Sequence, residues 1–241
     1  MKTVQIRKSM LLVAGALSFI ALLTGCIKDV SNTPPSPKTY VSIMHLAPRA
    51  PAVELYFNGS KASSAISPGI VSTSYAALDP SVFSVDFKKA GSDSVVANIP
   101  TDIYDSLKFY TLLLYNIDST HARAVKIDDD FSGLTSDKAY FRFFHMSPDI
   151  GNVDLFFESN AVSTGRQYAD NVGGSYYNQF NPISPNTYNI YVKKAGADSV
   201  IAQANQVFLN AGGAFTIFLK GIPGGTGINA LGVSVLQATN Q

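Results

Sequence analysis

The chain repeats its own sequence, and this repeat limits the folds available to it. The block His45–Pro48 (His-Leu-Ala-Pro) recurs 100 positions later as His145–Pro148 (His-Met-Ser-Pro). A block of ten residues from Lys88 recurs 105 positions later from Lys193, with eight residues identical. Each copy has the length of a domain rather than of a solenoid repeat. The sequence therefore predicts two related domains, with a net gain of five residues between the two blocks of the second copy.

Within each copy, apolar and polar residues alternate with a period of two. The alternating apolar sets are Val53, Leu55 and Phe57; Phe83, Val85 and Phe87; and Tyr188, Ile190 and Val192. Such alternation over short runs indicates β-strands with one buried face. We expect about seven strands per copy, in two tandem immunoglobulin-like antiparallel β-sandwich domains. The Cys-Trp-Cys core of immunoglobulin domains is absent, so the expectation concerns architecture alone.

The first 25 residues have the order of an export signal. Three basic residues precede an apolar run from Met10 to Leu23, and Leu-Thr-Gly then leads to Cys26, the single cysteine of the chain. This order marks a cleaved leader, and Leu-Thr-Gly-Cys resembles the bacterial lipobox. A transmembrane helix needs about 20 apolar residues, more than this run supplies. A plain secretory signal is the other alternative, but it would not require a cysteine there.

The predicted division of the chain follows from these features. A Pro-rich stretch after Cys26 is typical of an extended tether. The expected parts are a signal peptide (1–25), a lipidated Cys26 with its tether (26–38), a first sandwich (39–137) and a second sandwich (138–241). Two or more acyl chains on Cys26 would hold the protein in the membrane. We expect an outer-membrane lipoprotein, on the periplasmic or the cell-surface side, with Lys28-Asp29 faintly resembling the surface-export tags of Bacteroidetes lipoproteins.

Charge and cysteine content exclude several functions. Without residues 1–25 the chain has 15 basic and 17 acidic residues, a net charge of −2. This balance predicts no nucleic-acid partner and no electrostatic attraction to anionic membranes. With Cys26 acylated, no thiol remains for a disulfide, a metal thiolate or a nucleophile. We expect no cofactor, and stability must come from a core that can draw on 15 Phe and 12 Tyr residues.

The repeated signature also carries a family resemblance. It reads His-x-[Ser/Ala]-Pro-x-x-x-x-Val-[Asp/Glu]-Leu-[Tyr/Phe] in both copies, at His45–Phe57 and His145–Phe157. This signature resembles the domain-of-unknown-function family 4397, and two tandem copies would cover nearly the whole chain after the leader. The resemblance implies β-sandwiches in secreted or lipid-anchored bacterial proteins. It implies no catalytic residues, because the family has no assigned activity.

His45 and His145 occupy one position in each copy, and Pro48 and Pro148 follow them. Neither histidine lies in a metal-binding or catalytic motif. We therefore predict that each neutral imidazole bonds a backbone group and fixes a corner after a strand. No role is predicted for the third histidine, His121.

Two further segments resemble ligand-binding motifs but lack residues that those motifs require. Asp128-Asp129-Asp130 could contribute oxygen ligands to calcium, but the glycine and glutamate spacing of an EF-hand is missing. Gly221–Gly227 lacks the Lys-Ser/Thr ending of a phosphate-binding loop. We predict solvated loops in both places and no metal site. No Ser, His and Asp arrangement suggests catalysis, and we predict no catalytic residue.

Aromatic residues in the second copy are the strongest candidates for a binding site. Tyr176, Tyr177 and Phe180 lie among glycines and amides in the stretch Gly173–Asn181. This composition suits stacking on a sugar or pairing with a peptide, although alternate residues could instead fill the sandwich. The matching stretch of the first copy has one aromatic residue, Tyr75. We therefore assign a candidate ligand site to Tyr176, Tyr177 and Phe180.

The sequence thus favours a lipid-anchored envelope protein that presents two sandwiches for binding a glycan or an envelope protein, or for a structural role. An envelope hydrolase is the alternative from another class. It would need a polar cleft with two facing carboxylates or a metal held by histidine. A subunit of a surface or adhesin assembly is a third interpretation, in which an exposed edge strand pairs with a partner.

Overall fold

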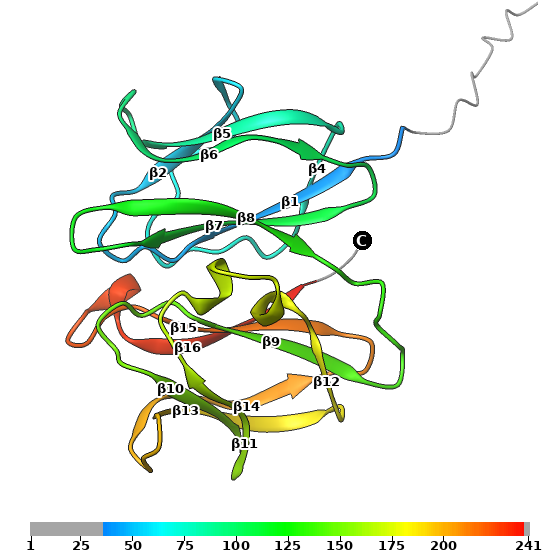
Figure 1. The fold of residues 1–241 in the computed structure, drawn as a ribbon, viewed down its shortest axis with the longest axis vertical. Helices are drawn as coiled ribbons and strands as arrows, with labels where there is room; N and C mark the ends of the chain where they lie inside the picture. The colour runs from blue at the N-terminus through cyan, green and yellow to red at the C-terminus, as the bar shows by residue number, and fades with distance from the viewer. Residues whose placement is uncertain (1–35, 239–241) are drawn as a thin grey trace, which may run out of the picture. The chain divides into compact units, whose positions relative to one another are not determined.

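The computed structural model describes residues 36–238, which form sixteen β-strands and three short 3-10 helices. The predicted all-β fold is confirmed, since the strands make four sheets in two sandwiches (Figure 1). The predicted signal peptide, Cys26 and most of the predicted tether lie outside the described residues. Within residues 36–238, no helix has the length and apolarity needed to cross a bilayer.

The first sandwich contains eight strands, one more than the sequence suggested. Its two sheets have the strand orders β4-β1-β7-β8 and β3-β2-β5-β6. The strands are β1 (Thr39–His45), β2 (Val53–Phe57), β3 (Ser60–Lys61), β4 (Ala76–Leu78), β5 (Ser81–Lys89), β6 (Val95–Tyr104), β7 (Phe109–Asn116) and β8 (Ala122–Asp129).

The second sandwich repeats this arrangement after the connection from β8 to β9. Its sheets have the strand orders β12-β9-β15-β16 and β11-β10-β13-β14. The strands are β9 (Ala139–His145), β10 (Val153–Phe157), β11 (Asn160–Arg166), β12 (Asn181–Ile183), β13 (Asn186–Lys194), β14 (Val200–Leu209), β15 (Ala214–Lys220) and β16 (Gly232–Ala238). The 3-10 helices are η1 (Asp170–Val172), η2 (Tyr176–Asn178) and η3 (Gly227–Asn229).

Each sandwich departs in one place from purely antiparallel pairing. β1 pairs in parallel with β7, and β9 pairs in parallel with β15. The other pairs between named strands are antiparallel, including the hairpins β5–β6 and β13–β14. The repeated Lys-Lys-Ala-Gly block forms the turns of these two hairpins. Gly91 and Gly196 have φ values of 70° and 69° there, a left-handed conformation that glycine adopts without strain.

The alternation along the strands produces one apolar core in each sandwich. Val53 and Leu55 of β2 lie in the first core with Val85 and Phe87 of β5. The corresponding residues of the second copy fill its core: Val153, Leu155, Ile190 and Val192. All of these positions except Val153 and Leu155 belong to the alternating sets that the sequence assigned to a buried face.

The two sandwiches pack against each other through the sheets that contain β1 and β9. The described residues from Pro37 onward form one compact unit, in which these sheets are the two inner layers (Figure 1). The strands β1, β7, β9 and β15 therefore have both faces covered. Their second faces form a buried cluster shared by both copies, and we call it the junction core: Met44, Leu46, Leu113, Tyr115, Ile127, Phe144, Met146, Ala169 and Phe218.

The strand registers locate the five residues that the second copy gains. Gly69 and Ala169 donate equivalent backbone hydrogen bonds to His45 and His145, with an offset of 100. β4 pairs with β1 in the same way that β12 pairs with β9, with an offset of 105 from Ala76 to Asn181. Six residues, 70–75, join these points in the first copy, whereas eleven residues, 170–180, join them in the second. We call residues 170–180 the added segment.

Both repeated histidines lie at the ends of strands and bond the backbone of the following corner. His45 Nε2 lies 3.0 Å from the carbonyl oxygen of Pro51, and His145 Nε2 lies 3.1 Å from that of Gly151. A carbonyl oxygen only accepts, so Nε2 carries the proton and Nδ1 is free to accept from the amide two residues on. Pro48 and Pro148 lie in the turns that these imidazoles bridge.

Burial lowers the pKa of His45 and of His145 below the ordinary value of 6.5. The unfolded chain therefore binds more protons than the folded chain as the pH falls below about 6.5. We expect the free energy of unfolding to decrease between pH 7 and pH 5.5, by at most about 1.4 kcal/mol per pH unit for each histidine. Urea denaturation across this range, with NMR titration of the imidazoles, measures this effect. Constant stability together with titration of both rings at or above 6.5 would contradict it.

Candidate functional site

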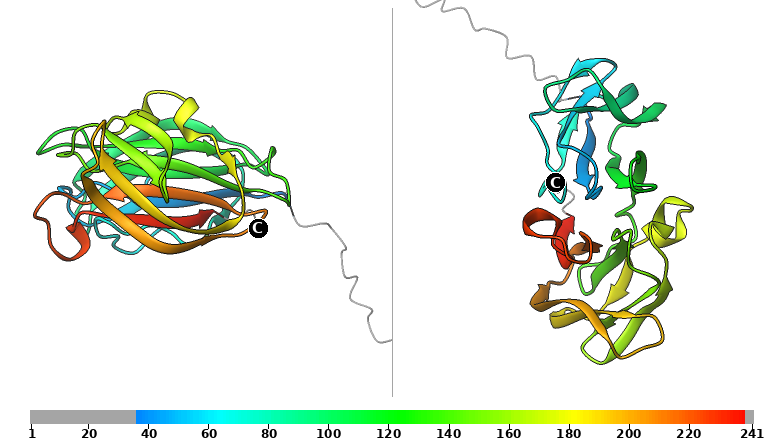
Figure 2. Two further views of the ribbon diagram at one scale, coloured as in Figure 1. Left: turned by 90° about the horizontal axis from the view of Figure 1, so that it is seen from below. Right: turned by 90° about the vertical axis from the view of Figure 1, so that its left-hand side faces the viewer.

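The added segment is the main structural difference between the two copies. It contains η1 and η2, which the side chain of Asn178 ties together by donating to the carbonyl oxygens of Asn171 and Gly174 at 3.0 and 3.4 Å. It leaves the sandwich after Ala169, whose φ of 53° matches the left-handed turn at Gly69 in the first copy. The segment lies beside β8 of the first sandwich (Figure 2), so residues of both copies surround it.

Arg166 anchors the added segment to the second sandwich. Its guanidinium bonds both carboxylate oxygens of Asp170, at 2.7 and 2.6 Å, and the carbonyl oxygen of Phe143 at 2.8 Å. The equivalent residue of the first copy is Ile66. Arg166 pairs with Val153, the first residue of β10, and Ile66 pairs with Val53, the first residue of β2. A bidentate pair with a buried guanidinium holds its partner in one geometry. The exchange of Ile for Arg therefore accompanies the added segment.

Tyr176 and Tyr177 form an aromatic platform above Arg166. The Tyr177 ring lies 4.0 Å from the Arg166 guanidinium, and the Tyr176 ring meets Tyr177 edge-on at 5.1 Å. Tyr176 is 74% exposed. Both rings border a pocket of about 270 Å³, which we call the rim pocket. Its other walls are Phe141, Phe143, Val162, Ser163, Thr164, Arg166 and Asn181.

Phe180 has a different environment from the two tyrosines. It stacks on Phe131 with ring centroids 5.3 Å apart, and the Arg142 guanidinium carbon lies 4.5 Å from the centroid of the Phe180 ring. Its position matches that of Tyr75 in the first copy, because each immediately precedes the edge strand β12 or β4. Phe180 therefore packs at the junction of the sandwiches, while Tyr176 and Tyr177 share the rim pocket. The structure thus divides the three predicted site residues into two groups.

A buried ion pair crosses the junction. Arg142 Nη1 of β9 lies 2.6 Å from Asp129 Oδ1 of β8, and neither side chain is more than 1% exposed. Tyr75 and Thr111 each donate a hydroxyl hydrogen bond of 2.6 Å to the other carboxylate oxygen, Oδ2. Burial, and then the neighbouring Asp129, raise the pKa of Tyr75 well above its ordinary value, so its hydroxyl remains a donor. The carboxylate is thus satisfied on both oxygens.

The two residues of the ion pair have no charged equivalents in the other copy. Thr111 and Thr216 are equivalent, and Arg142 Nε donates to Thr216 Oγ1 at 2.8 Å. The first-copy equivalent of Arg142 is Ser42, which instead bonds Thr111 at 3.2 Å. The strand registers place Ala238 opposite Ala214, as Asp129 lies opposite Phe109. One copy therefore supplies the cation and the other the anion, so the pair fixes a single arrangement of the two sandwiches.

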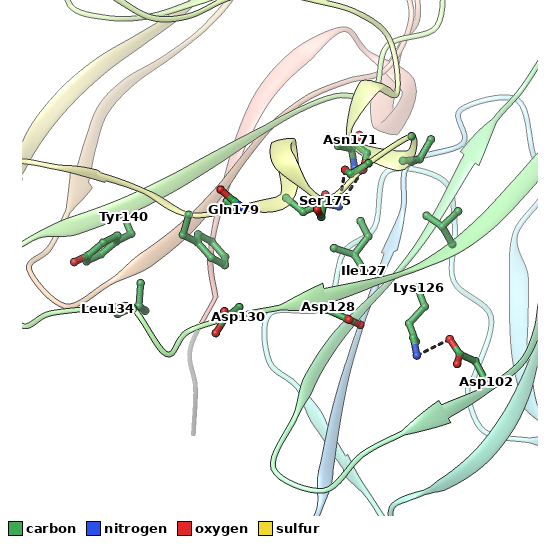
Figure 3. A pocket seen from close by; sticks show the side chains of 17 residues that line it. Asp102, Lys126, Ile127, Asp128, Asp130, Leu134, Tyr140, Asn171, Ser175 and Gln179 are labelled. Atoms are coloured by element: carbon green, nitrogen blue, oxygen red, sulfur yellow. Dashed lines mark hydrogen bonds and ion pairs between the residues drawn. The ribbon is translucent and has the colours of Figure 1, made fainter.

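A polar groove of about 940 Å³ runs between β8 and the added segment, and we call it the junction groove (Figure 3). Asp128 and Asp130 form one wall with Lys126, whose ammonium is paired with Asp102 at 2.6 Å. The facing wall belongs to the added segment: Asn171, Val172, Gly173, Gly174, Ser175, Asn178, Gln179 and Phe180. This groove is larger than the rim pocket and is lined by both copies.

The other segments considered from the sequence do not form a site. The prediction of a solvated loop at Asp128-Asp129-Asp130 is wrong in part, because Asp128 and Asp129 end strand β8 and Asp129 is buried against Arg142. Asp128 and Asp130 are exposed, so the three carboxylates do not converge. Within residues 36–238, no group of three or more His, Cys, Asp or Glu side chains is placed to hold a metal ion. Residues 221–226 connect β15 to η3, which begins at Gly227. His121 lies in the loop between β7 and β8, beside Asp118 at 2.8 Å.

Sequence reasoning missed Arg142, Asp129 and Arg166. A signal for the two arginines was present, since each replaces a small or apolar residue at a repeat position: Ser42 and Ile66. A charged residue at a position expected to be buried indicates a specific partner. Asp129 lay within an acidic run and could not be distinguished from its solvated neighbours without the strand register.

A comparison with known families finds one match, to part of the chain. Residues 39–156 match the family model described as "Domain of unknown function (DUF4397)". The match covers the first sandwich, β9 and most of β10, and it includes both signatures, His45–Pro48 and His145–Pro148. No curated protein matches the sequence. The family supplies no activity, so any functional conclusion must come from the added segment and its surroundings.

Proposed function

We propose that this protein is a lipid-anchored, non-enzymatic module of the bacterial envelope that binds a glycan through its second sandwich. The observation that carries this proposal is the exposed Tyr176 ring at the border of a pocket with hydroxyl, amide and guanidinium groups. An aromatic face can stack on the apolar face of a sugar ring, while neighbouring polar groups bond its hydroxyls. Ser163, Thr164 and Asn181 supply those groups here.

The contacts that hold Tyr177 in place favour a role for the platform in binding. Arg166 is held by Asp170 and by the carbonyl of Phe143, and Tyr177 rests on its guanidinium. A platform ordered before the ligand arrives loses less conformational entropy when the ligand binds. The first copy lacks both the arginine and the added segment, so we assign the glycan site to the second copy alone.

The size of the rim pocket limits the ligand. About 270 Å³ is slightly below the range of about 300–1,000 Å³ typical of pockets for drug-sized molecules. The pocket therefore suits one sugar unit, at the end of a glycan or within it, with the rest of the chain over Tyr176. The residues that line it include no carboxylate, whereas glycoside hydrolysis ordinarily uses two. This favours binding over the hydrolase interpretation.

Replacing Tyr176 by alanine is expected to weaken glycan binding about tenfold, the loss that corresponds to about 1.4 kcal/mol of contact free energy. Stability should change little, because the ring is mostly exposed. Calorimetric titration with the glycan selected on an array measures the affinity. Phe208→Ala is the matched control, since Phe208 is 65% exposed on β14 and lies outside the rim pocket. Equal affinities of the two variants would contradict the proposed site.

The array itself tests the broader proposal. The full chain, purified in detergent, is applied to bacterial and host glycans. Selective binding that Tyr176→Ala reduces would support the proposal. Absence of any selective binding across the array would overturn the glycan function.

The anchor is a separate part of the proposal. It rests on the lipobox order ending at Cys26 and on the Pro-rich stretch that follows it. We expect the natural protein to carry two or three acyl chains on Cys26 and to partition with the outer membrane, with the cell-surface side favoured. Mass spectrometry of the mature N-terminus and protease treatment of intact cells test these points. A Cys26→Ser variant that still partitions with the membrane would contradict the anchor.

A further inference from the structure

The residues that line the junction groove do not include Tyr176 or Tyr177 of the aromatic platform, and the glycan proposal does not use this groove. We propose that this groove binds a basic peptide segment of a partner protein, whose arginine guanidinium lies between β8 and the added segment. The site takes a carboxylate wall from the first sandwich and an amide wall from the second. It therefore exists only when the two copies are packed together.

The first wall carries a net negative charge, because the groove is lined by the carboxylates of Asp102, Asp128 and Asp130 and by one ammonium group, that of Lys126. Lys126, Asp128 and Asp130 follow one another at every second position, so they share one face of β8 and its extension. Lys126 is neutralised by Asp102 and also donates to the carbonyl oxygen of Ile103 at 2.8 Å. Asp128 and Asp130 keep two negative charges toward the groove (Figure 3). Hydrogen bonds from Ser132 lower the pKa of Asp130, which keeps it ionised.

The second wall contains buried amide groups without partners. Asn171 is 0% exposed, and neither its Nδ2 nor its Oδ1 has a hydrogen-bond partner among the described residues. The Oδ1 of Asn178 is buried and unpartnered as well. Leaving a buried polar atom unsatisfied costs about 1–3 kcal/mol, so three such atoms beside one groove call for an explanation. A bound group that donates hydrogen bonds would satisfy the two amide oxygens.

These two walls together match the chemistry of arginine. A guanidinium is planar, always charged and carries five N–H donors. The carboxylates of Asp128 and Asp130 and the amide oxygens of Asn171 and Asn178 are all acceptors. The groove volume of about 940 Å³ exceeds that of one side chain, so it also leaves room for the flanking backbone. Gly173 and Gly174 also line the groove, and because they have no side chains, the peptide backbone can approach the backbone of the added segment there.

Titration of the full chain in detergent with a short glycine–arginine peptide tests the proposal. We expect saturable binding with a Kd below about 1 mM, and at least tenfold weaker binding when citrulline replaces arginine. Citrulline keeps the planar shape but removes the charge. Free arginine and spermidine distinguish a peptide from a small cation, and both should bind more weakly than the peptide. Binding should weaken as salt rises, because the groove charges are exposed.

Two variants locate the site. The double variant Asp128→Asn, Asp130→Asn should bind the peptide at least tenfold more weakly. Asp93→Asn, Asp198→Asn removes the same charge from two fully exposed hairpin positions, and it should change the affinity less than twofold. Asn171→Leu should weaken peptide binding about fivefold without lowering the melting temperature, because leucine removes the unsatisfied amide.

Several results would overturn the proposal. They are no binding of the arginine peptide, equal binding of the citrulline peptide, tighter binding of spermidine than of the peptide, or equal losses in the two double variants. The glycan titration separates this proposal from the previous one. A protein that binds its glycan normally but ignores the arginine peptide refutes the groove proposal alone.

Discussion

Replacing Arg142 by methionine is expected to lower the free energy of unfolding by about 3–5 kcal/mol, because it leaves the Asp129 carboxylate buried without its cation. The loss is a large part of the about 5–15 kcal/mol that stabilises an ordinary domain. Asp129→Asn should be similarly harmful, since it leaves the guanidinium without its anion. Urea denaturation followed by tyrosine fluorescence and circular dichroism measures both variants.

The double variant Arg142→Met, Asp129→Asn is the decisive control. It removes both charges and keeps an amide oxygen to accept from Tyr75 and Thr111, so it should be much more stable than the sum of the single losses implies. A positive coupling above about 1 kcal/mol is expected from this cycle. Additive losses would show that the two side chains act independently and would contradict the role assigned to the pair.

Phe144→Ala is expected to destabilise the protein by about 3–5 kcal/mol, the range for buried aromatic truncations. Phe144 is fully buried, but its contacts lie in the junction core rather than in the core of its own sandwich. The loss should therefore lower the unfolding transitions of both sandwiches together. Scanning calorimetry shows whether one transition or two shift.

The exposed Phe208 is again the matched control, and Phe208→Ala should change the stability by less than about 0.5 kcal/mol. If Phe144→Ala shifted only a transition of the second sandwich and left the first unchanged, the packing of the two copies into one unit would be wrong.

The fold was largely predictable because its determinants are local. Period-two alternation at Val53–Phe57 and Tyr188–Val192 assigns the buried faces, and the repeated turn at Gly91 and Gly196 joins the strands as expected. The parallel pairing of β1 with β7 was not predictable. It joins strands about seventy residues apart, and no local pattern records which distant edge a strand will meet.

The candidate site was predictable only in part. The shift in repeat offset showed that the second copy gains five residues, and the cluster of Tyr176 and Tyr177 indicated the right segment. Phe180 followed them in sequence, yet its side chain lies against Arg142 at the junction. The junction groove could not be predicted from the sequence, because Asp128 and Asn171 belong to different copies. Their proximity depends on how two sheets pack, which the sequence pattern does not specify.

Both proposed binding sites depend on the added segment, so exchanging this segment tests them together. In the full chain, Arg166–Phe180 is replaced by the equivalent first-copy residues Ile66–Tyr75, and glycan and arginine-peptide binding are measured by calorimetric titration with circular dichroism as the folding check. We expect a folded protein that binds neither ligand, because the platform and the amide wall are gone. A folded chimera that binds either ligand with unchanged affinity would contradict this expectation.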